Sequence, residues 1–397
     1  MSVTAARGFV ASAGRAGIKA SGDDIALLAT AGRRPVPTAA TFTSNLAAAA
    51  PVLVSREHLE STGGMASAVV LTSGNANAAT GERGVDDARR LCRGVAHRLG
   101  VSEEEVLVCQ TGLIGIPFPL DEADAAIPAI AGALGGSRSD GRLAAQAIMT
   151  TDTVVKEAVY EGDEFTVGGM AKGAAMLAPN MATMLAVLTT DGVCEPGALQ
   201  DTLWRAVDRT FNRLSVDGCT STNDTVILMA SGESGAGGPA EGGPGRDGEE
   251  LYPGVEKVCG SLARMMADDA EGATKTASVV VRGAESEAAA LAAARKVAES
   301  QLVKCSLNGA DPYWGRVMSE LGSAGVPFDP SLVSISYGGV VVCRGGVAAE
   351  HDTVRVEGYM AGQHIEIGCD LAIGTGEAGM LFTDLGHGYI DENRTTS

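Results

Sequence analysis

The feature that most constrains this chain is a run of 18 consecutive uncharged residues, 173–190, with the sequence GAAMLAPNMATMLAVLTT. The run is as long as a membrane-spanning helix requires. It contains Pro179, Asn180 and several threonines, which disfavour a membrane helix. Two interpretations remain. The run is either a buried strand interrupted by a Pro-Asn turn, or a segment that carries chemistry.

Charge and composition exclude several classes of partner. The 397 residues include 30 Lys+Arg against 49 Asp+Glu, a net charge of −19 that argues against a phosphate-binding surface. Aromatic residues make up only 4%, so platforms for stacking bases are scarce. Apolar residues reach 45%, enough for a large core. We therefore expect neither a nucleic-acid nor a membrane partner, and either two domains or one large sheet-based unit.

The eight cysteines are widely separated, the nearest pair being Cys92 and Cys109. This spacing contains no CxxC motif, and the five histidines form no HExxH motif, so no metal site is expected. Buried thiols in a reducing cytoplasm are the simplest interpretation. The first 22 residues carry three basic and no acidic side chains, a faint similarity to a transit peptide. The sequence RGFVASAG within them is equally typical of a first strand.

Local patterns predict an α+β protein. Residues 1–80 alternate short apolar runs with Gly, Asn and Thr clusters, as strands joined by tight loops do. Helical spacing of apolar residues predicts helices at 85–100, ending at Gly100, and at 195–217. Helical spacing also occurs near 255–265 and 287–302, a buried strand is expected at 106–109, and residues from 331 on suggest a β-rich terminal part. The low-complexity segment 231–250 is expected to form a surface loop or to be disordered.

Thr183 is the candidate nucleophile of the uncharged run. A threonine hydroxyl needs an adjacent base, and its own α-amino group becomes one once the preceding peptide bond is cut. The small side chain of Ala182 would ease attack of the hydroxyl on the preceding carbonyl. No GxSxG motif offers a competing serine.

Nine segments in order resemble the ornithine acetyltransferase (bifunctional glutamate N-acetyltransferase) family of arginine biosynthesis, and they cover nearly the whole chain. They are RGFVASAG, SGNANAATG, QTGLIG, AIMTTDT, GGMAKGAAMLAPNMATML, TFNRLSVDGCTSTNDT, DAEGATK, GADPYWGR and YIDENRTTS. Nine ordered blocks are far more specific than any single motif. The resemblance implies a helix–sheet–sheet–helix sandwich with a smaller β-rich C-terminal subdomain from about residue 280 to 397.

The resemblance also assigns residues. It implies self-cleavage between Ala182 and Thr183, giving an α chain of residues 1–182 and a β chain of residues 183–397. Thr183 becomes the N-terminal acyl-accepting nucleophile, and Thr111 with Gly112 forms the oxyanion hole. By themselves these two residues suggest only a plain turn.

Substrate-contacting positions are the remaining assignments from the resemblance: Thr150, Lys172, Thr183, Glu271, Asn393 and Ser397. Lys172 suits a substrate α-carboxylate and Glu271 the ammonium of ornithine, although these two roles could be exchanged and either side chain could simply be solvated. Asn393 and Ser397 stand in a polar C-terminus, which is normally frayed.

The resemblance implies a cytoplasmic enzyme that transfers acetyl from N-acetylornithine to glutamate, with acetyl-CoA as a second donor in bifunctional members. It implies no metal or organic cofactor, and an assembly of two α and two β chains. Three departures from the family pattern are Cys219, Tyr313 and a tail one residue shorter. They keep open an inactive relative with a binding role, an amidohydrolase using the same nucleophile, and a specialised acyltransferase.

Overall fold

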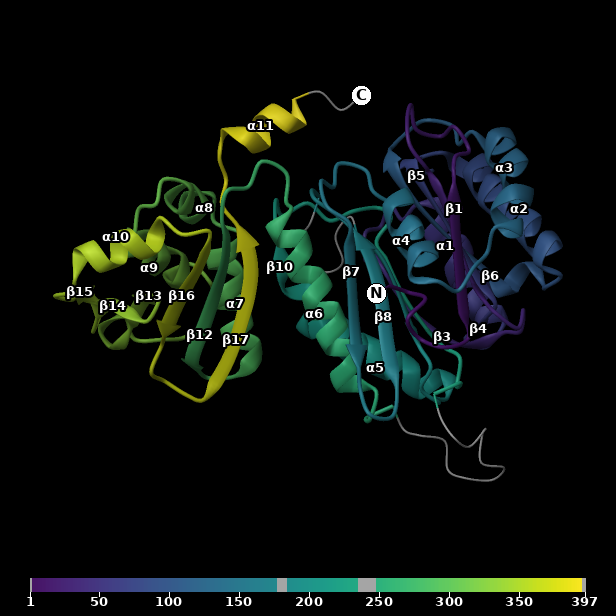
Figure 1. Cartoon of the computed structure of the whole chain (residues 1–397). Helices are drawn as coiled ribbons and strands as arrows, with labels where there is room; N and C mark the ends of the chain where they lie inside the picture. Colours follow the sequence, from purple (N-terminus) through teal and green to yellow (C-terminus); the bar gives the residue numbers. More distant parts are fainter. Residues whose placement is uncertain (1, 177–183, 235–247, 395–397) are drawn as a thin grey trace. The chain divides into compact units, whose positions relative to one another are not determined.

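A computed structural model describes residues 2–176, 184–234 and 248–394 (Figure 1). The chain divides into two compact units. The first comprises the residues up to Asn212 together with Cys219–Met266, and the second comprises Arg213–Gly218 together with the residues from Ala267 on. The C-terminal subdomain was expected from about residue 280. The predicted α and β chains are defined by cleavage of a peptide bond and not by a boundary between compact units, so they stay a prediction.

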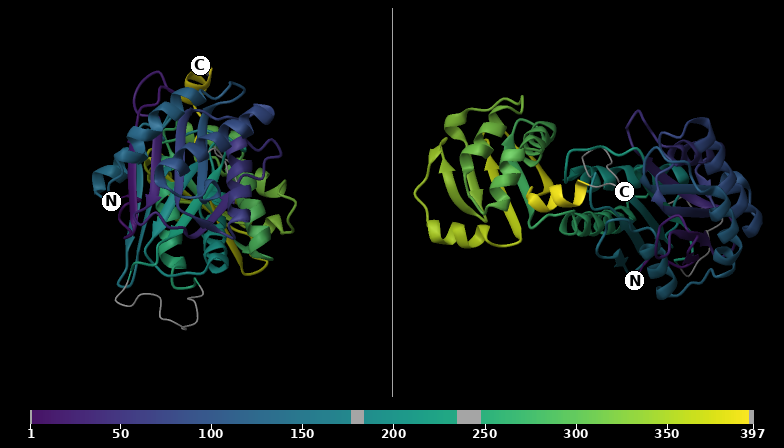
Figure 2. Two further views of the ribbon diagram at one scale, coloured as in Figure 1. Left: turned by 90° about the vertical axis from the view of Figure 1, so that its right-hand side faces the viewer. Right: turned by 90° about the horizontal axis from the view of Figure 1, so that it is seen from above.

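The first unit contains a four-stranded sheet whose outer face is covered by helices. Its strands are, in spatial order, β1 (Phe9–Gly14), β2 (Ile25–Thr30), β5 (Ala68–Asn75) and β6 (Val106–Leu113). Only β5 and β6 pair in parallel. The covering helices are α1 (Ala50–Ser61), α2 (Gly81–Leu99) and α3 (Leu120–Gly132) (Figures 1 and 2). Apolar side chains such as Leu27, Val70, Leu91 and Ile127 fill the space between these helices and the sheet.

A six-stranded sheet packs on the other face of the first. Its order is β4 (Met65–Ala66), β3 (Val36–Phe42), β11 (Thr225–Ala230), β9 (Leu185–Thr190), β8 (Thr166–Lys172) and β7 (Lys156–Glu161). Between the two sheets lies one core, to which Leu28 and Leu107 contribute from one side and Val187 and Ile227 from the other. Helix α4 (Arg138–Ala147) borders this core beside β1.

Two helices, α5 (Pro196–Arg209) and α6 (Tyr252–Asp268), cover the outer face of the six-stranded sheet. Helix α6 approaches β8 closely, because a Cβ atom at Gly169 would lie 2.8 Å from Val258 Cγ1. The predicted helix–sheet–sheet–helix sandwich is therefore confirmed.

The second unit is a seven-stranded sheet with helices. Its strand order is β10 (Leu214–Ser215), β17 (Gly376–Thr383), β12 (Thr276–Ala284), β16 (His364–Asp370), β13 (Ser334–Tyr337), β14 (Val340–Arg344) and β15 (Val347–Ala348). The helices are α7 (Glu287–Ala298), α8 (Gln301–Asn308), α9 (Trp314–Gly322), α10 (Thr353–Met360) and α11 (His387–Asn393). Its core includes Val279, Val297, Ile367 and Phe382. Strand β10 comes from a distant part of the sequence and pairs in parallel with β17.

Two helices predicted from the spacing of apolar residues differ in how well their ends were predicted. Helix α2 ends where expected, because Gly100 adopts φ 72° and its N–H caps the Ala96 carbonyl. The helix expected over 195–217 was too long, since α5 ends at Arg209. Phe211–Arg213 forms a 3-10 turn, and Leu214 then begins a strand. The chain passes into the second unit here, so Leu214 packs in a different sheet from α5.

The uncharged run begins directly after one strand, β8, and its last six residues form the neighbouring strand, β9. Strand β8 ends at Lys172 and β9 begins at Leu185, and the two pair antiparallel in the middle of the six-stranded sheet. All residues of β9 are buried. Residues 177–183 within the run lie outside the described residues, as do 235–247 of the low-complexity segment. None of the helices in the described ranges combines the length and apolar character of a membrane span.

All eight cysteines lie within the described residues as free thiols. Six are buried, as expected. Cys219 and Cys305 are exposed, which corrects the expectation that every thiol is buried, because both stand on segments with one face in solvent.

Candidate active site

The end of β6 carries the two residues assigned to the oxyanion hole. Thr111 is buried, whereas Gly112 beside it is exposed. Gly112 has φ 133°, and a Cβ atom there would lie 2.2 Å from the carbonyl carbon of Gly74 on β5. Only glycine fits this close approach. The end of the strand is thus specialised for backbone contact, although its role in catalysis stays a prediction.

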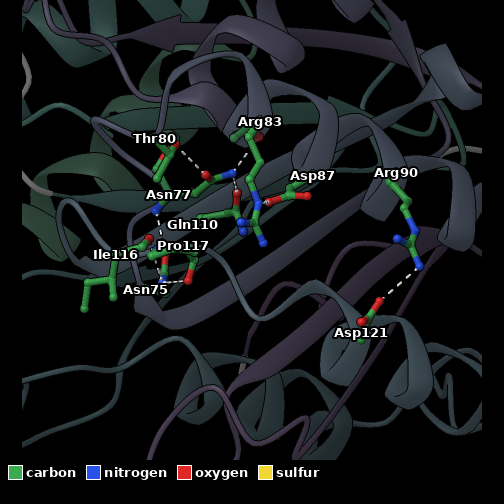
Figure 3. A network of polar contacts seen from close by, with 11 residues as sticks. Asn75, Asn77, Thr80, Arg83, Asp87, Arg90, Gln110, Ile116, Pro117 and Asp121 are labelled. Carbon is green, nitrogen blue, oxygen red and sulfur yellow. Dashed lines mark hydrogen bonds and ion pairs between the residues drawn. The ribbon is translucent and has the colours of Figure 1, made fainter.

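A polar network behind this strand end fixes its direction (Figure 3). Gln110 directly precedes Thr111, and its side-chain oxygen accepts a hydrogen bond from Asn77 Nδ2 at 2.9 Å. Asn75 Nδ2 donates to the carbonyls of Ile116 and Pro117, at 3.3 and 3.1 Å. Asn75, Asn77 and Gln110 are buried, so these bonds are shielded from water. The SGNANAATG segment therefore supports the loop that follows Gly112.

Lys172 lies against the hydroxyl of Thr111. Its ammonium donates a hydrogen bond to Thr111 Oγ1 at 3.3 Å, and its side chain is 3% exposed. Lys172 is the last residue of β8, so the contact joins the two sheets of the first unit. Because the hydroxyl oxygen accepts from Lys172, its own proton remains available for donation to another acceptor.

Asp152 ties the Thr150 loop to the end of β8. Its Oδ2 accepts from the Thr150 N–H at 3.1 Å, and its Oδ1 accepts from the Gly173 N–H at 2.7 Å and from Lys156 Nζ at 2.6 Å. Burial alone would raise the pKa of Asp152, but the charges of Lys172 and Lys156 and these hydrogen bonds outweigh it. The pKa is therefore lowered from its usual value, so the carboxylate is held ionised. The predicted residues Thr111, Thr150 and Lys172 are thus connected in one cluster.

Lys19 is a member of this cluster that sequence reasoning missed. Its Nζ donates to the carbonyls of Ala147 and Met149, at 3.4 and 3.0 Å, just before Thr150. Its stem lies over Gly74, where an added Cβ would be 2.7 Å from Lys19 Cγ. Burial lowers the pKa of Lys19, although the charges of Asp24, Asp23 and Asp152 oppose this effect. The sequence offered no signal beyond a basic side chain near the N-terminus.

The loop that contains Lys19 is held by a single buried carboxylate. Asp24 accepts hydrogen bonds from the backbone N–H groups of Ala16, Gly17 and Lys19, at 2.6, 2.9 and 3.0 Å. Asp24 is fully buried. Its negative charge is thereby spread over three donors, and the loop that carries Lys19 has a fixed path beside β5.

Glu271 and Asn393 form a separate pair within the second unit. Asn393 Nδ2 donates to Glu271 Oε2 at 2.7 Å. Gly272, with φ 62°, allows the loop after α6 to touch the start of α11, because a Cβ there would lie 2.1 Å from the Gly388 carbonyl carbon. Glu271 is 8% exposed and Asn393 is exposed. The Glu271–Asn393 pair belongs to the second unit, and the Lys172 cluster belongs to the first.

Three assigned residues, Ala182, Thr183 and Ser397, lie outside the described residues. Of the departures from the family pattern, Cys219 is exposed. Tyr313 is 56% exposed, and its ring faces the Arg316 guanidinium at 5.9 Å. Both departures are therefore surface side chains.

Comparisons with known proteins agree with the nine ordered segments. A profile described as the ArgJ family matches residues 10–395. Proteins called arginine biosynthesis bifunctional protein ArgJ are similar over 100% of this chain, with 45% identity in Streptomyces avermitilis (100% of that protein) and 44% in Mycobacterium leprae (95% of that protein).

Two solved structures also match parts of the chain. The ArgJ protein of Bacillus halodurans is 32% identical, with a TM-score of 0.48, and the match covers 52% of this chain and 96% of that one. The ornithine acetyltransferase of Mycobacterium tuberculosis, solved with ornithine, is 43% identical, with a TM-score of 0.43, and the match covers 45% of this chain and 94% of that one.

The class that the sequence predicted, an N-acyltransferase of arginine biosynthesis, is thereby confirmed. The chain belongs to the ArgJ family. The individual roles of the site residues stay predictions.

Proposed function

We propose that this chain transfers an acetyl group from N-acetylornithine to glutamate through an acetyl ester on Thr183, after self-cleavage between Ala182 and Thr183. The observation that carries this proposal is the Lys172–Thr111 hydrogen bond beside the left-handed Gly112. It supports a site where a hydroxyl and a backbone N–H together bind a developing oxyanion.

The first half-reaction forms the acyl-enzyme. The Thr183 hydroxyl attacks the acetyl carbonyl of N-acetylornithine, and the α-amino group of Thr183 takes the hydroxyl proton. The tetrahedral intermediate collapses by breaking the C–N bond, and the same proton passes to the departing amine of ornithine. In the second half-reaction, the amine of glutamate attacks the ester, and the Thr183 hydroxyl regains its proton. N-acetylglutamate leaves.

The oxyanion hole lowers the barrier of both half-reactions. Thr111 would donate its hydroxyl proton and Gly112 its backbone N–H to the negative oxygen of each intermediate. Preorganised donors of this kind typically contribute about 2.7–4 kcal/mol. The positive charge of Lys172 on the Thr111 oxygen strengthens the hydroxyl as a donor.

Two ammonium groups of the cluster suit the carboxylate of an amino-acid substrate. Lys156 is neutralised by Asp152 at 2.6 Å, whereas Lys172 and Lys19 add two further positive charges to the same cluster. Asp23 and Asp24 lie near Lys19 and offset part of this charge, so the two ammonium groups suit the carboxylate as hydrogen-bond donors at defined positions. Glu271, held by Asn393, would bind the side-chain ammonium of ornithine.

Self-cleavage would use the same nucleophile. The Thr183 hydroxyl attacks the Ala182 carbonyl, the C–N bond breaks to give an ester and a free α-amine, and water then hydrolyses that ester. The products are an α chain of residues 1–182 and a β chain of residues 183–397. We include in this proposal a cytoplasmic location and an α2β2 assembly, and use of acetyl-CoA as a second donor. Native mass spectrometry of the purified protein tests the assembly.

Intact-mass analysis tests the central proposal. The wild-type protein and the Thr183→Ala variant are compared before and after incubation with N-acetylornithine. We expect fragments that end at Ala182 and begin at Thr183 in the wild type, with an acetyl adduct of ~42 Da on the second fragment. We expect one uncleaved chain for the variant. A single unmodified wild-type chain would contradict the proposal, and release of acetate instead of N-acetylglutamate in excess glutamate would indicate a hydrolase.

A further inference from the structure

Two adjacent side chains, Asn223 and Asp224, connect the oxyanion strand to the strand that follows the nucleophile. They stand immediately before β11, in the TFNRLSVDGCTSTNDT segment. Asn223 is 3% exposed and Asp224 is fully buried. Neither has an assigned role in the function proposed above.

Asn223 binds the backbone of the oxyanion strand β6 and the backbone just after its neighbour β5. Its Nδ2 donates to the Gln110 carbonyl at 2.9 Å and to the Ala76 carbonyl at 2.6 Å. Gln110 directly precedes Thr111 in the sequence, and Ala76 directly follows Asn75, the last residue of β5. The two amide protons of Asn223 therefore hold the backbone that directly precedes Thr111 and Gly112.

Asp224 binds the backbone of the other strand. Its Oδ1 accepts from the Met184 N–H at 2.8 Å, and Met184 is the residue bonded to Thr183. The Thr225 N–H donates in turn to the Met184 carbonyl at 3.2 Å. Met184 is thus held on both sides by the beginning of β11, just where β9 starts.

The other oxygen of Asp224 is unusual. Among the described residues, Oδ2 has no hydrogen-bond partner although it is buried. Burial raises the pKa of Asp224 well above its usual value, against the opposing effects of the Met184 N–H, the Ser221 hydroxyl and the charge of Lys172. A neutral carboxyl keeps Oδ1 as an acceptor and gives Oδ2 a proton to donate.

We propose that Asn223 and Asp224 are positioning residues that together fix the oxyanion strand relative to Met184, the residue that directly follows the proposed nucleophile. One side chain fixes Gln110 and the next fixes Met184, so the two catalytic strands are connected through a single peptide unit. Asp224 performs this role as the neutral acid. The inference rests on the proposed function, because Thr183 must be the nucleophile for Met184 to matter.

Four variants test the inference: Asn223→Ala, Asp224→Ala, Asp224→Asn and the control Asn45→Ala. Asn45 is matched, because its Nδ2 donates at 2.9 Å to the carbonyl of Thr220, three residues before Asn223 and on neither catalytic strand. Cleavage is followed by intact mass, and kcat and KM are measured for N-acetylornithine with glutamate. Circular dichroism and thermal unfolding verify that each variant is folded.

We expect Asn223→Ala to lower kcat by about 10²-fold with little change in KM, because misplacement by about 1 Å costs a factor of this size. Asp224→Ala should slow cleavage and lower kcat to a similar degree. Asp224→Asn should cleave and turn over like the wild type, with the same pH profile, since an amide replaces a neutral carboxyl. The control should match the wild type. If Asn223→Ala does not fold, Asn223→Gln, which displaces the amide by one methylene, should give the same loss of kcat.

Several results would overturn the inference. If both alanine variants cleave and turn over like the wild type, the inference fails while the proposed function stands. If Asp224→Asn is as impaired as Asp224→Ala, the neutral acid is wrong and Asp224 acts as an anion. If the wild type itself neither cleaves nor transfers acetyl, the proposed function fails, and the inference fails with it.

Discussion

At the scale of single residues, the site depends on side chains whose protonation and donor capacity are set by their neighbours. Thr111 accepts from Lys172 and so can donate only outward. Asp152 remains ionised because two lysines and two backbone N–H groups surround it. An aspartate on an open surface would have an ordinary pKa, and a threonine hydroxyl there would have no defined direction.

The first prediction concerns the Thr111 hydroxyl. Thr111→Val keeps the shape of the side chain but removes the donor, so kcat should fall by about 10²–10³-fold. KM should change little, because the hydroxyl acts on the intermediate and not on the bound substrate. Steady-state kinetics on fully cleaved protein measure this effect. Thr111→Ser, which keeps a hydroxyl, is the control, and equal kcat values for the two variants would contradict the assignment.

A second residue-scale prediction concerns Lys19. Lys19→Met should raise KM for N-acetylornithine and for glutamate by about 10-fold, because a charged hydrogen bond is worth about 1.5–3 kcal/mol. Arg15→Met is a matched control, since the guanidinium of Arg15 in the same loop donates to the exposed carbonyl of Ala20. Unchanged KM values in Lys19→Met would show that Lys19 merely fixes the loop before Thr150.

At the scale of elements, buried lysines hold strands and helices together in the second unit. Lys304 of α8 donates to the carbonyl of Val216 after β10, at 2.8 Å, and to that of Thr383 at the end of β17, at 2.7 Å. Burial lowers the pKa of Lys304 to about 8, although Asp217 and Asp384 raise it. A neutral amine has two N–H donors, which match the two carbonyls.

The pH dependence of stability follows from this pKa. Between about pH 8 and 10.5, the unfolded chain holds a proton on Lys304 that the folded chain has released, so this group makes the free energy of unfolding rise with pH. Lys304→Met lacks the effect. Between pH 7.5 and 9.5, the wild type should gain about 2 kcal/mol relative to the variant in urea unfolding. A constant difference between the two proteins would contradict the lowered pKa.

At the scale of the whole molecule, the described cores belong to one unit or the other. The first unit has one core between its sheets and one beneath α1, α2 and α3, and the second unit has a core of its own. The chain contains two tryptophans, Trp204 on α5 and Trp314 on α9, one in each unit. Each unit therefore has its own fluorescent reporter.

This distribution gives a prediction for unfolding. The single-tryptophan variants Trp204→Phe and Trp314→Phe should show urea transitions with different midpoints, because each unit buries its own apolar surface. Fluorescence follows the unfolding of one unit in each variant. Circular dichroism, which reports on both units, should show the two transitions together. Coincident transitions by every probe would mean that the two units unfold as one.

The sequence by itself determined the features that depend on local order. The helix ending at Gly100 could be identified from residue types and spacing alone, and the ordered motifs that resemble an acyltransferase family could be identified from the sequence, with Gly112 among them. The spacing of apolar residues reveals these elements because side chains recur on one face every 3.6 residues in a helix and every two residues in a strand. The alternation of apolar runs also predicted the α+β class, whereas the layered sandwich was implied by the resemblance to the family.

Only the tertiary structure decided which distant residues meet. Lys19 binds the Met149 carbonyl just before Thr150, and Asn223 with Asp224 joins Gln110 to Met184, through contacts that no local pattern specifies. The end of α5 at Arg209 has the same origin, because Leu214 belongs to the sheet of another unit. Burial and close approach of charges arise only when these strands pack, and so the pKa values that prepare the site are properties of the fold.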